Sequence, residues 1–200
     1  MIKIAITGFI GYEVAAGLFR QHQKELEQRF GRSFLRSFEK LSEQQGEEKE
    51  FFVSDKEGQP AFLALLLDKG GLFGTLWKAC DQWQMLEESS HSPVGCRIYL
   101  DAVPIKQEVV ELTELYEENP YELESTGALL LVWNEDTESE LPEECSQLIK
   151  KAAVIGKITK EKERILIQED AVRYLTPPSR QQKDIKDRKK TKITDREQEV

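Results

Sequence analysis

The feature that most constrains the fold is an alternation of strand-like and helix-like apolar segments along the chain. Short runs rich in β-branched and aromatic residues are typical of strands, and apolar residues repeated on one face are typical of helices. The expected strands cover residues 2–7, 51–54, 61–67, 96–100, 128–133, 154–159 and 164–168. The expected helices cover residues 12–30 and 34–41, a segment opened by Gly70 and Gly71, residues 107–117, and a segment capped by Ser139. This alternation predicts an α/β protein with helices layered on a sheet.

The length and the apolar content allow one core. The chain has 200 residues, of which 39% are hydrophobic. A domain of this size buries roughly 70% of the surface of its unfolded chain, so it needs neither metals nor disulfides. The longest apolar run, residues 61–67, is far shorter than the roughly 20 residues of a membrane helix. Gly8 comes too early for the apolar core of a signal peptide. We therefore expect a cytoplasmic protein with no membrane contact.

The charge is unevenly distributed. Residues 179–200 carry eight Lys/Arg and five Asp/Glu, whereas residues 1–178 carry 20 basic and 32 acidic residues, a net charge of −12. An acidic body repels phosphate backbones, so nucleic acid is not an expected partner. The composition of residues 179–200 is too polar to form a core. We therefore predict one domain over residues 1–178 and a charged, disordered tail over residues 179–200.

The cysteines and histidines do not indicate a catalytic or metal site. Cys80, Cys96 and Cys145 are three in number, without a C-x-x-C pair, which argues against both a disulfide framework and a zinc site. Each is interpreted as a small buried hydrophobe. Neither His22 nor His91 belongs to a catalytic pattern. No catalytic residue and no metal ligand are predicted.

Gly70 and Gly71 precede an expected helix, and this is the best candidate for contact with an anion. Exposed amides at a helix N-terminus attract phosphate, and Lys69 would add a positive charge. The alternative is that the two glycines permit the strand-to-helix turn and close packing of the helix.

Several short segments, taken in order, resemble a known family. They are residues 7–11 (TGFIG), 70–77 (GGLFGTLW), 103–108 (VPIKQE), 119–123 (NPYEL), 125–130 (STGALL), 155–159 (IGKIT) and 175–178 (LTPP). Their order and spacing resemble the C-terminal domain of AIR (aminoimidazole ribonucleotide) synthase-related proteins, particularly hydrogenase expression/formation maturation factors. The resemblance implies an α/β domain of the α+β type, with three α/β/α layers and a mixed sheet. It also places Thr126 and Gly127 near the family's cleft, as further candidates for anion contact.

The sequence departs from this family at the positions that carry its chemistry. The family has a His-Asp-x-Thr-x-Gly-Gly stretch facing the cleft, and residues 65–71 align with it. Leu65, Leu66 and Asp68 replace the histidine, the aspartate and the threonine. These replacements remove groups suited to metal and phosphate. Hydrogenase maturation enzymes end in a cysteine nucleophile, whereas this sequence ends in Glu-Val.

The resemblance leaves two hypotheses for the function. In the family, the ligands of ATP and magnesium belong to a preceding N-terminal domain, and we expect that half to be absent from this chain. The first hypothesis is a catalytically degenerate stand-alone domain that acts as a binding, scaffold or regulatory module. The alternative is one half of a split ATP-dependent enzyme, with ATP and magnesium held by another chain. The chain is not expected to be catalytic alone, and no cofactor of its own is predicted.

The consecutive leucines Leu65, Leu66 and Leu67 suggest an interface. Side chains alternate between the two faces of a strand, so three leucines in a row place apolar groups on both. If one face is open at the old cleft, residues 65–71 form a contact surface for a homodimer or a separate protein. The alternative is a buried strand with helices on both sides.

Overall fold

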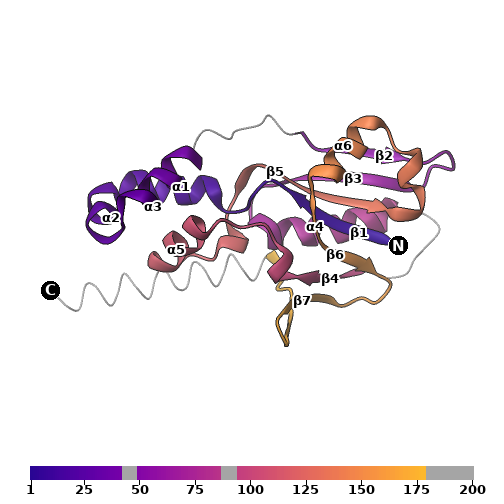
Figure 1. Cartoon of the computed structure of the whole chain (residues 1–200). Helices are drawn as coiled ribbons and strands as arrows, with labels where there is room; N and C mark the ends of the chain where they lie inside the picture. Colours follow the sequence, from indigo (N-terminus) through magenta and orange to yellow (C-terminus); the bar gives the residue numbers. More distant parts are fainter. Residues whose placement is uncertain (42–48, 87–93, 179–200) are drawn as a thin grey trace.

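The computed structural model describes residues 1–41, 49–86 and 94–178, and within them it forms a single eight-stranded sheet (Figure 1). The strand order is β2-β3-β5-β1-β6-β4-β7-β8. Neighbouring strands are antiparallel except β4 and β7, which are parallel, so the sheet is mixed. The strands are β1 (Ile2–Thr7), β2 (Phe51–Ser54), β3 (Pro60–Leu67), β4 (Gly95–Tyr99), β5 (Ser125–Asn134), β6 (Ala153–Thr159), β7 (Arg164–Gln168) and β8 (Ala171–Tyr174).

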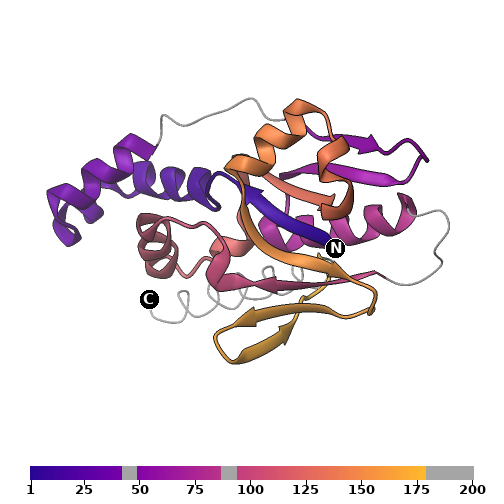
Figure 2. The same cartoon turned by 45° about the vertical axis from the view of Figure 1, so that its right-hand side comes forward.

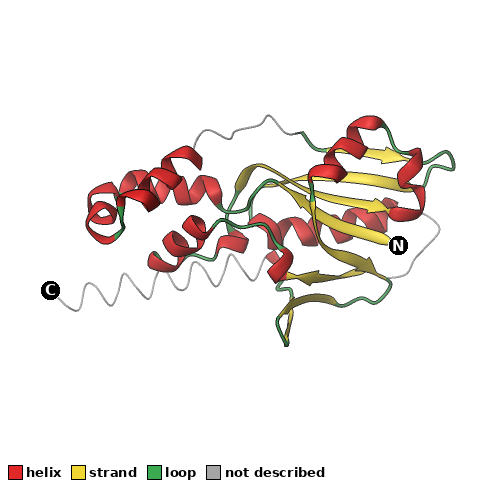
Figure 3. Ribbon diagram, viewed as in Figure 1, coloured by secondary structure: helices red, strands yellow, loops and turns green. Residues whose placement is uncertain are grey.

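The helices fall into two groups. Helices α4 and α6 pack on opposite faces of the sheet, which confirms the expected three layers. Helices α1, α2, α3 and α5 gather beside the sheet in both views (Figures 1 and 2). The α-helices are α1 (Tyr12–Gln21), α2 (Gln23–Arg29), α3 (Arg32–Leu41), α4 (Gly71–Leu86), α5 (Gln107–Leu115) and α6 (Glu143–Lys151). The described residues also form three short 3-10 helices, drawn with the others in Figure 3, namely η1 (Leu100–Ala102), η2 (Pro120–Glu122) and η3 (Glu135–Glu140).

Strand β3 shows how the apolar pattern builds two cores. Leu65 and Leu67 face α4, are each 2% exposed and belong to the first core, which also contains Leu76 of α4. Leu66 points to the other face, where it is half-buried against the second core, which contains Cys145 of α6. Because side chains alternate along a strand, a continuous run of leucines supplies both cores. Strand β3 is therefore covered by helices on both faces, as the alternative prediction for residues 65–67 expected.

The first long helix is interrupted. One helix was predicted over residues 12–30, but α1 ends at Gln21 and α2 begins at Gln23. His22 lies between them with φ −115° and ψ 20°, and its ring centroid is 4.4 Å from that of Tyr116. After the break, Leu26 of α2 is fully buried in a third cluster, together with Phe19 of α1 and Leu112 of α5.

Two further predictions are corrected near the end of the chain. Ser139 does not cap a helix, because it lies within η3, and α6 begins four residues later at Glu143. The side chain of Asn134 accepts a hydrogen bond from the amide of Asp136, which starts the 3-10 turn instead. Strand β8 was not predicted, since none of its four residues is buried.

The cysteines lie as predicted. Cys80, Cys96 and Cys145 are free and buried. His91 and the tail over residues 179–200 lie outside the described residues. No helix in the described ranges is long and apolar enough to cross a membrane.

Candidate functional site

The predicted anion-contact residues lie at one edge of the sheet. Leu67 at the end of β3 pairs with Ser125 at the start of β5, and Thr7 at the end of β1 pairs with Leu129. The turns that follow β1 and β3 therefore lie beside the start of β5. We call this region the glycine-rich edge. It contains five glycines with positive φ, namely Gly8, Gly11, Gly70, Gly71 and Gly127.

Gly71 permits a close approach between two backbone segments. Its φ is +56°, and a Cβ atom at this position would lie 2.5 Å from the carbonyl oxygen of Leu123. Its amide donates a hydrogen bond to the carbonyl of Asp68 at 2.8 Å. A carbonyl oxygen therefore lies beside the first residue of α4, where a bound phosphate would need a clear approach. This geometry favours the packing role of Gly71, and anion contact stays a prediction.

The same edge holds the start of β5 against the turn after β1. A Cβ atom on Gly8 would lie 3.1 Å from the carbonyl oxygen of Gly127. The amide of Gly11 donates to Ser125 Oγ at 2.7 Å, and that hydroxyl donates to the carbonyl of Leu123 at 3.1 Å. The two segments are thus joined through buried polar contacts.

Further hydroxyl groups of the edge also have partners. Thr7 Oγ1 accepts the amide of Leu129 at 3.1 Å, and the Thr126 hydroxyl donates to the carboxylate of Glu13. The hydroxyl of Thr75, near the start of α4, donates to the carbonyl of Gly71 at 2.8 Å. Hydroxyls engaged in this way stabilise the edge and are not poised as nucleophiles.

The exposed charges at the edge are mixed. Asp68 and Lys69 are exposed on the turn after β3. Glu124 is exposed just before Thr126 in the chain, and Glu13, which accepts the hydrogen bond of the Thr126 hydroxyl, is also exposed. Lysines that lie among carboxylates give a weak field for an anion, because the charges oppose one another. The structure thus gathers Lys69, Gly70, Gly71, Thr126 and Gly127, without giving them a clearly positive setting.

Phe9 is a feature of this edge that the sequence interpretation did not single out. Its side chain is 36% exposed in the turn after β1, and Lys106 Nζ lies 3.9 Å from its ring centroid. The amide of Ile10 donates to the carbonyl of Pro104 at 3.0 Å and fixes this turn. An aromatic residue between Gly8 and Ile10 was visible in the sequence, but only the structure places it at the surface beside a cation.

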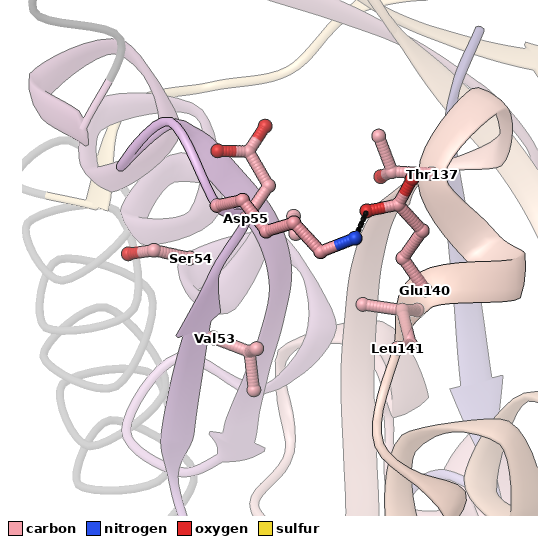
Figure 4. Close-up of a pocket in the computed structure, with 8 residues that line it drawn as sticks. Val53, Ser54, Asp55, Thr137, Glu140 and Leu141 are labelled. Atoms are coloured by element: carbon pink, nitrogen blue, oxygen red, sulfur yellow. Dashed lines mark ion pairs between the residues drawn. The ribbon is translucent and has the colours of Figure 1, made fainter.

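A hollow lies at the opposite end of β3 from the glycine-rich edge (Figure 4). It has a volume of about 170 Å³. Lys56 Nζ lies 3.3 Å from Glu140 Oε2, and both side chains are at least half exposed. Asp55 Oδ1 accepts the amides of Glu57 and Gln59, so this carboxylate is used to form the hairpin turn. The lining residues are Val53, Ser54, Asp55, Lys56, Ala61, Thr137, Glu140 and Leu141. This hollow contains no buried ionisable group that would suit catalysis.

Two of the three thiols are also poorly suited to catalysis. A hydrogen bond with Cys96, together with burial, raises the pKa of Cys80, so that its thiol stays protonated near neutral pH. Burial and the nearby charge of Glu144 raise the pKa of Cys145. Thiolates are the reactive form of cysteine, so these two residues are expected to be inert. The described residues contain no group of three or more His, Cys, Asp or Glu able to hold a metal ion.

Part of the chain matches a known protein family. Residues 84–168 match the family described as AIR synthase related protein, C-terminal domain. A search of curated proteins gives no match.

Similar solved structures cover most of this chain. The crystal structure of hydrogenase maturation protein HypE is 19% identical, with a TM-score of 0.54, over 88% of this chain and 52% of that chain. The HypE–HypF complex gives 17% identity and a TM-score of 0.53, over 88% of this chain and 53% of that chain. HypE in complex with ATP gives 19% identity and a TM-score of 0.52, over 88% of this chain and 50% of that chain.

At sequence identities of 17–19%, the similarity to these solved structures shows that the fold is alike and nothing further. The present chain spans about half the length of the HypE chains it matches. Residues 84–168 of this chain are thus similar to the AIR synthase related C-terminal domain, and the fold of the chain is similar to that of HypE.

Proposed function

We propose that this domain is a binding module and does not catalyse a reaction by itself. The observation that carries the proposal is the end of β3. Leu65 and Leu66 align with the histidine and aspartate of the family's cleft motif, and Leu65 is 2% exposed in the first core. An aliphatic side chain packed in a core neither ligates a metal ion nor polarises a phosphate.

The glycine-rich edge is the surface that we assign to binding. In two-domain relatives, as the resemblance implies, the C-terminal domain packs against the ATP-binding half across this edge. Phe9 and Lys106 would supply an exposed aromatic ring and a charge for such a contact, since aromatic and cationic groups are common in protein interfaces. The HypE–HypF complex shows that a protein of similar fold assembles with another protein.

A nucleotide-binding measurement tests the catalytic part of this proposal. We expect millimolar ATP with magnesium to leave the melting temperature of the full chain unchanged, and we expect no phosphate release. A ligand at 100 times its dissociation constant adds roughly 2.7 kcal/mol of stability. For a chain of this size, that corresponds to a rise of about 5 to 10 °C. A rise of this order that disappears with a chelator would contradict the proposal, and magnesium chloride alone is the control.

A second candidate is one half of a split ATP-dependent enzyme. The solved complex of HypE with ATP favours it, because that protein has a similar fold and the chain covers half of it. The test adds a purified N-terminal ATP-binding domain of a HypE-type protein to this chain. Phosphate release by the mixture, and by neither component alone, would establish the split enzyme. A stable complex without phosphate release would favour the binding module.

A further inference from the structure

Half of one face of the sheet lies outside both cores. The second core, on the α6 side, is built from β1, β2, β3, β5 and α6, with neighbouring residues of the η3–α6 and α6–β6 connections. Within the described ranges, no side chain of β6, β4, β7 or β8 belongs to it. Figure 2 shows α6 beside β1 and no described helix in front of β4, β6 and β7. These four strands therefore present a surface on the α6 side that is largely exposed, although Ile165 of β7 is buried within it.

The strand register identifies the side chains on this surface. Residues paired directly across neighbouring strands share a face. Lys157 pairs with Lys3 on β1 and with Arg97 on β4, and Lys3 in turn pairs with Trp133 on β5. Because Trp133 belongs to the second core, this row of side chains lies on the α6 side of the sheet. Tyr174 and Val172 join the same face through Ile165 and Ile167 of β7. We call this surface the open face and define it by Arg97, Tyr99, Val154, Lys157, Val172 and Tyr174.

The apolar side chains of the open face are unusually exposed. Tyr99 is 47% exposed, Val154 is 49%, Val172 is 64% and Tyr174 is 71%. Eight large hydrophobic side chains are exposed in the described residues, and these are four of them. Single exposed apolar residues are ordinary on a protein surface, but their concentration on one face is typical of a contact surface.

The same face carries a row of positive charge. Lys3, Lys157 and Arg97 lie directly opposite one another on β1, β6 and β4. Like charges in this position repel one another and destabilise the sheet. Lys3 is compensated by Glu135 at 3.4 Å, whereas Arg97 and Lys157 have no ion-pair partner in the part of the chain that the structure describes. A ligand that supplies carboxylates would relieve this repulsion.

We propose that the open face docks an extended acidic segment of another protein, one that carries aromatic or aliphatic side chains between its carboxylates. Arg97 and Lys157 would pair with the carboxylates, and Tyr99, Val172 and Tyr174 would hold the apolar side chains. Arginine and tyrosine are the residue types that most often anchor such contacts. An extended segment fits because β8 is the last strand of the sheet, so its free edge adjoins the apolar residues.

Charge favours this occupant over the alternatives. Asp101 and Glu169 lie beside the Tyr99 end of the face, so the positive charge is confined to the row of Arg97 and Lys157 and suits a short acidic segment better than a long polyphosphate backbone. In a symmetric dimer the same patch would face itself, which would bring the Arg97 and Lys157 charges of two copies together. The open face shares no residue with the glycine-rich edge, so this proposal stands independently of the function proposed above.

The test uses the full chain and a fluorescein-labelled peptide, Glu-Glu-Phe-Glu-Glu-Leu-Phe-Glu-Glu, with fluorescence anisotropy at low salt. A peptide with glutamine in place of every glutamate is the matched probe. We expect the acidic peptide to bind at least about tenfold more tightly than the glutamine peptide, and we expect added salt to weaken it. The double variant Arg97→Glu with Lys157→Glu should lose about tenfold in affinity. The control, Lys150→Glu with Lys151→Glu on exposed positions of α6, makes the same charge change and should bind like the wild type.

The apolar half is tested by Val172→Ser with Tyr174→Ser, which should also weaken binding of the acidic peptide. Melting curves verify that each variant is folded, as expected for exposed positions. Equal binding by wild type and the Arg97/Lys157 variant, or no binding by wild type, would overturn the proposal. A wild-type dimer that Tyr174→Ser converts to monomer would assign the face to a second copy and also overturn it. None of these results depends on whether the chain binds ATP.

Discussion

The guanidinium group of Arg164 lies over the indole ring of Trp77, with its central carbon 3.8 Å from the ring centroid. Arg164 Nη2 also pairs with Asp81 Oδ1 at 2.5 Å, and Trp77 Nε1 donates to the carbonyl of Thr176 at 2.8 Å. These contacts join α4, the start of β7 and the segment after β8. The Arg164 side chain is only 9% exposed, so its contacts are shielded from solvent.

We expect Arg164→Ala to lower the free energy of unfolding by about 1–3 kcal/mol, through loss of the stacking on Trp77 and of the packing around it. The pair with Asp81 adds little, because that carboxylate is 60% exposed. Arg173→Ala, at an exposed position of β8, is the matched control and should change stability by less than about 0.5 kcal/mol. Urea unfolding followed by circular dichroism measures both. Equal effects of the two substitutions would show that the stacking does not stabilise the domain.

Gly71 and Gly17 provide a second matched pair. Gly71→Ala places a Cβ atom 2.5 Å from the Leu123 carbonyl oxygen in a residue with φ +56°, so we expect a loss of more than about 1 kcal/mol. Gly17 lies inside α1 with no atom within 4 Å of its would-be Cβ, so Gly17→Ala should stabilise by about 0.5–1 kcal/mol. Thermal unfolding of the two variants tests this difference in sign. Unchanged stability of Gly71→Ala would mean that the segment around Leu123 moves freely away from α4.

Much of the sheet was predictable, because most of its strands are apolar runs of strand length. Strand β3 and the helix α4 after Gly70 are clear examples, since the leucine run and the glycine pair mark their common boundary. The break at His22 was not predictable, because it depends on packing against Tyr116 of a segment far along the chain. Strand β8 was missed for a different reason. It is exposed on both faces and has no pattern of burial to detect.

The sequence singled out residues that the structure gathers at the glycine-rich edge, and their role in binding stays a prediction. The glycine pairs stood out because each needs an unusual backbone conformation. Whether Gly71 faces a ligand or a neighbouring backbone depends on where Leu123 lies, and that position is set by tertiary packing. The exposure of Phe9 could not be predicted from the sequence either. An aromatic residue beside a buried isoleucine is ordinarily interpreted as part of a core.

Tyr121 gives the chain a component of stability that depends on pH. Burial, with a smaller contribution from the charge of Asp101, raises the pKa of Tyr121 above its usual value of 10.0. In the unfolded chain the hydroxyl loses its proton first, so stability from this group is complete below pH 10 and declines as the pH rises further. Tyr121→Phe keeps the ring that stacks on Phe73, with centroids 5.4 Å apart, but removes the titrating group. We expect the wild type to lose more stability than this variant between pH 9 and pH 11, measured by urea unfolding. A parallel decline in both proteins would contradict this role of Tyr121.

The neighbouring leucines of β3 test whether residues 65–71 act as an interface. Leu65→Ala removes a side chain that is 2% exposed in the first core, so we expect a loss of about 2–5 kcal/mol. Leu66→Ala removes a half-buried side chain on the other face, so the loss should be smaller, about 1 kcal/mol. Melting temperatures should fall by roughly 2–4 °C for each kcal/mol lost.

Sedimentation of the wild type and of Leu66→Asp then separates packing from assembly. Leu65 and Leu67 are buried under α4, so Leu66 is the leucine of this run with the most exposed surface for contact with a partner. Its amide donates to Glu50 Oε1 at 3.1 Å, and that carboxylate also pairs with Lys78 at 2.6 Å, so polar groups already surround this end of the strand. Polar groups around Leu66 disfavour a homodimer interface that excludes water. We therefore expect Leu66→Asp to have a lower melting temperature than the wild type, with an unchanged sedimenting mass. A wild-type oligomer that becomes a folded monomer in Leu66→Asp would instead establish residues 65–71 as the contact surface.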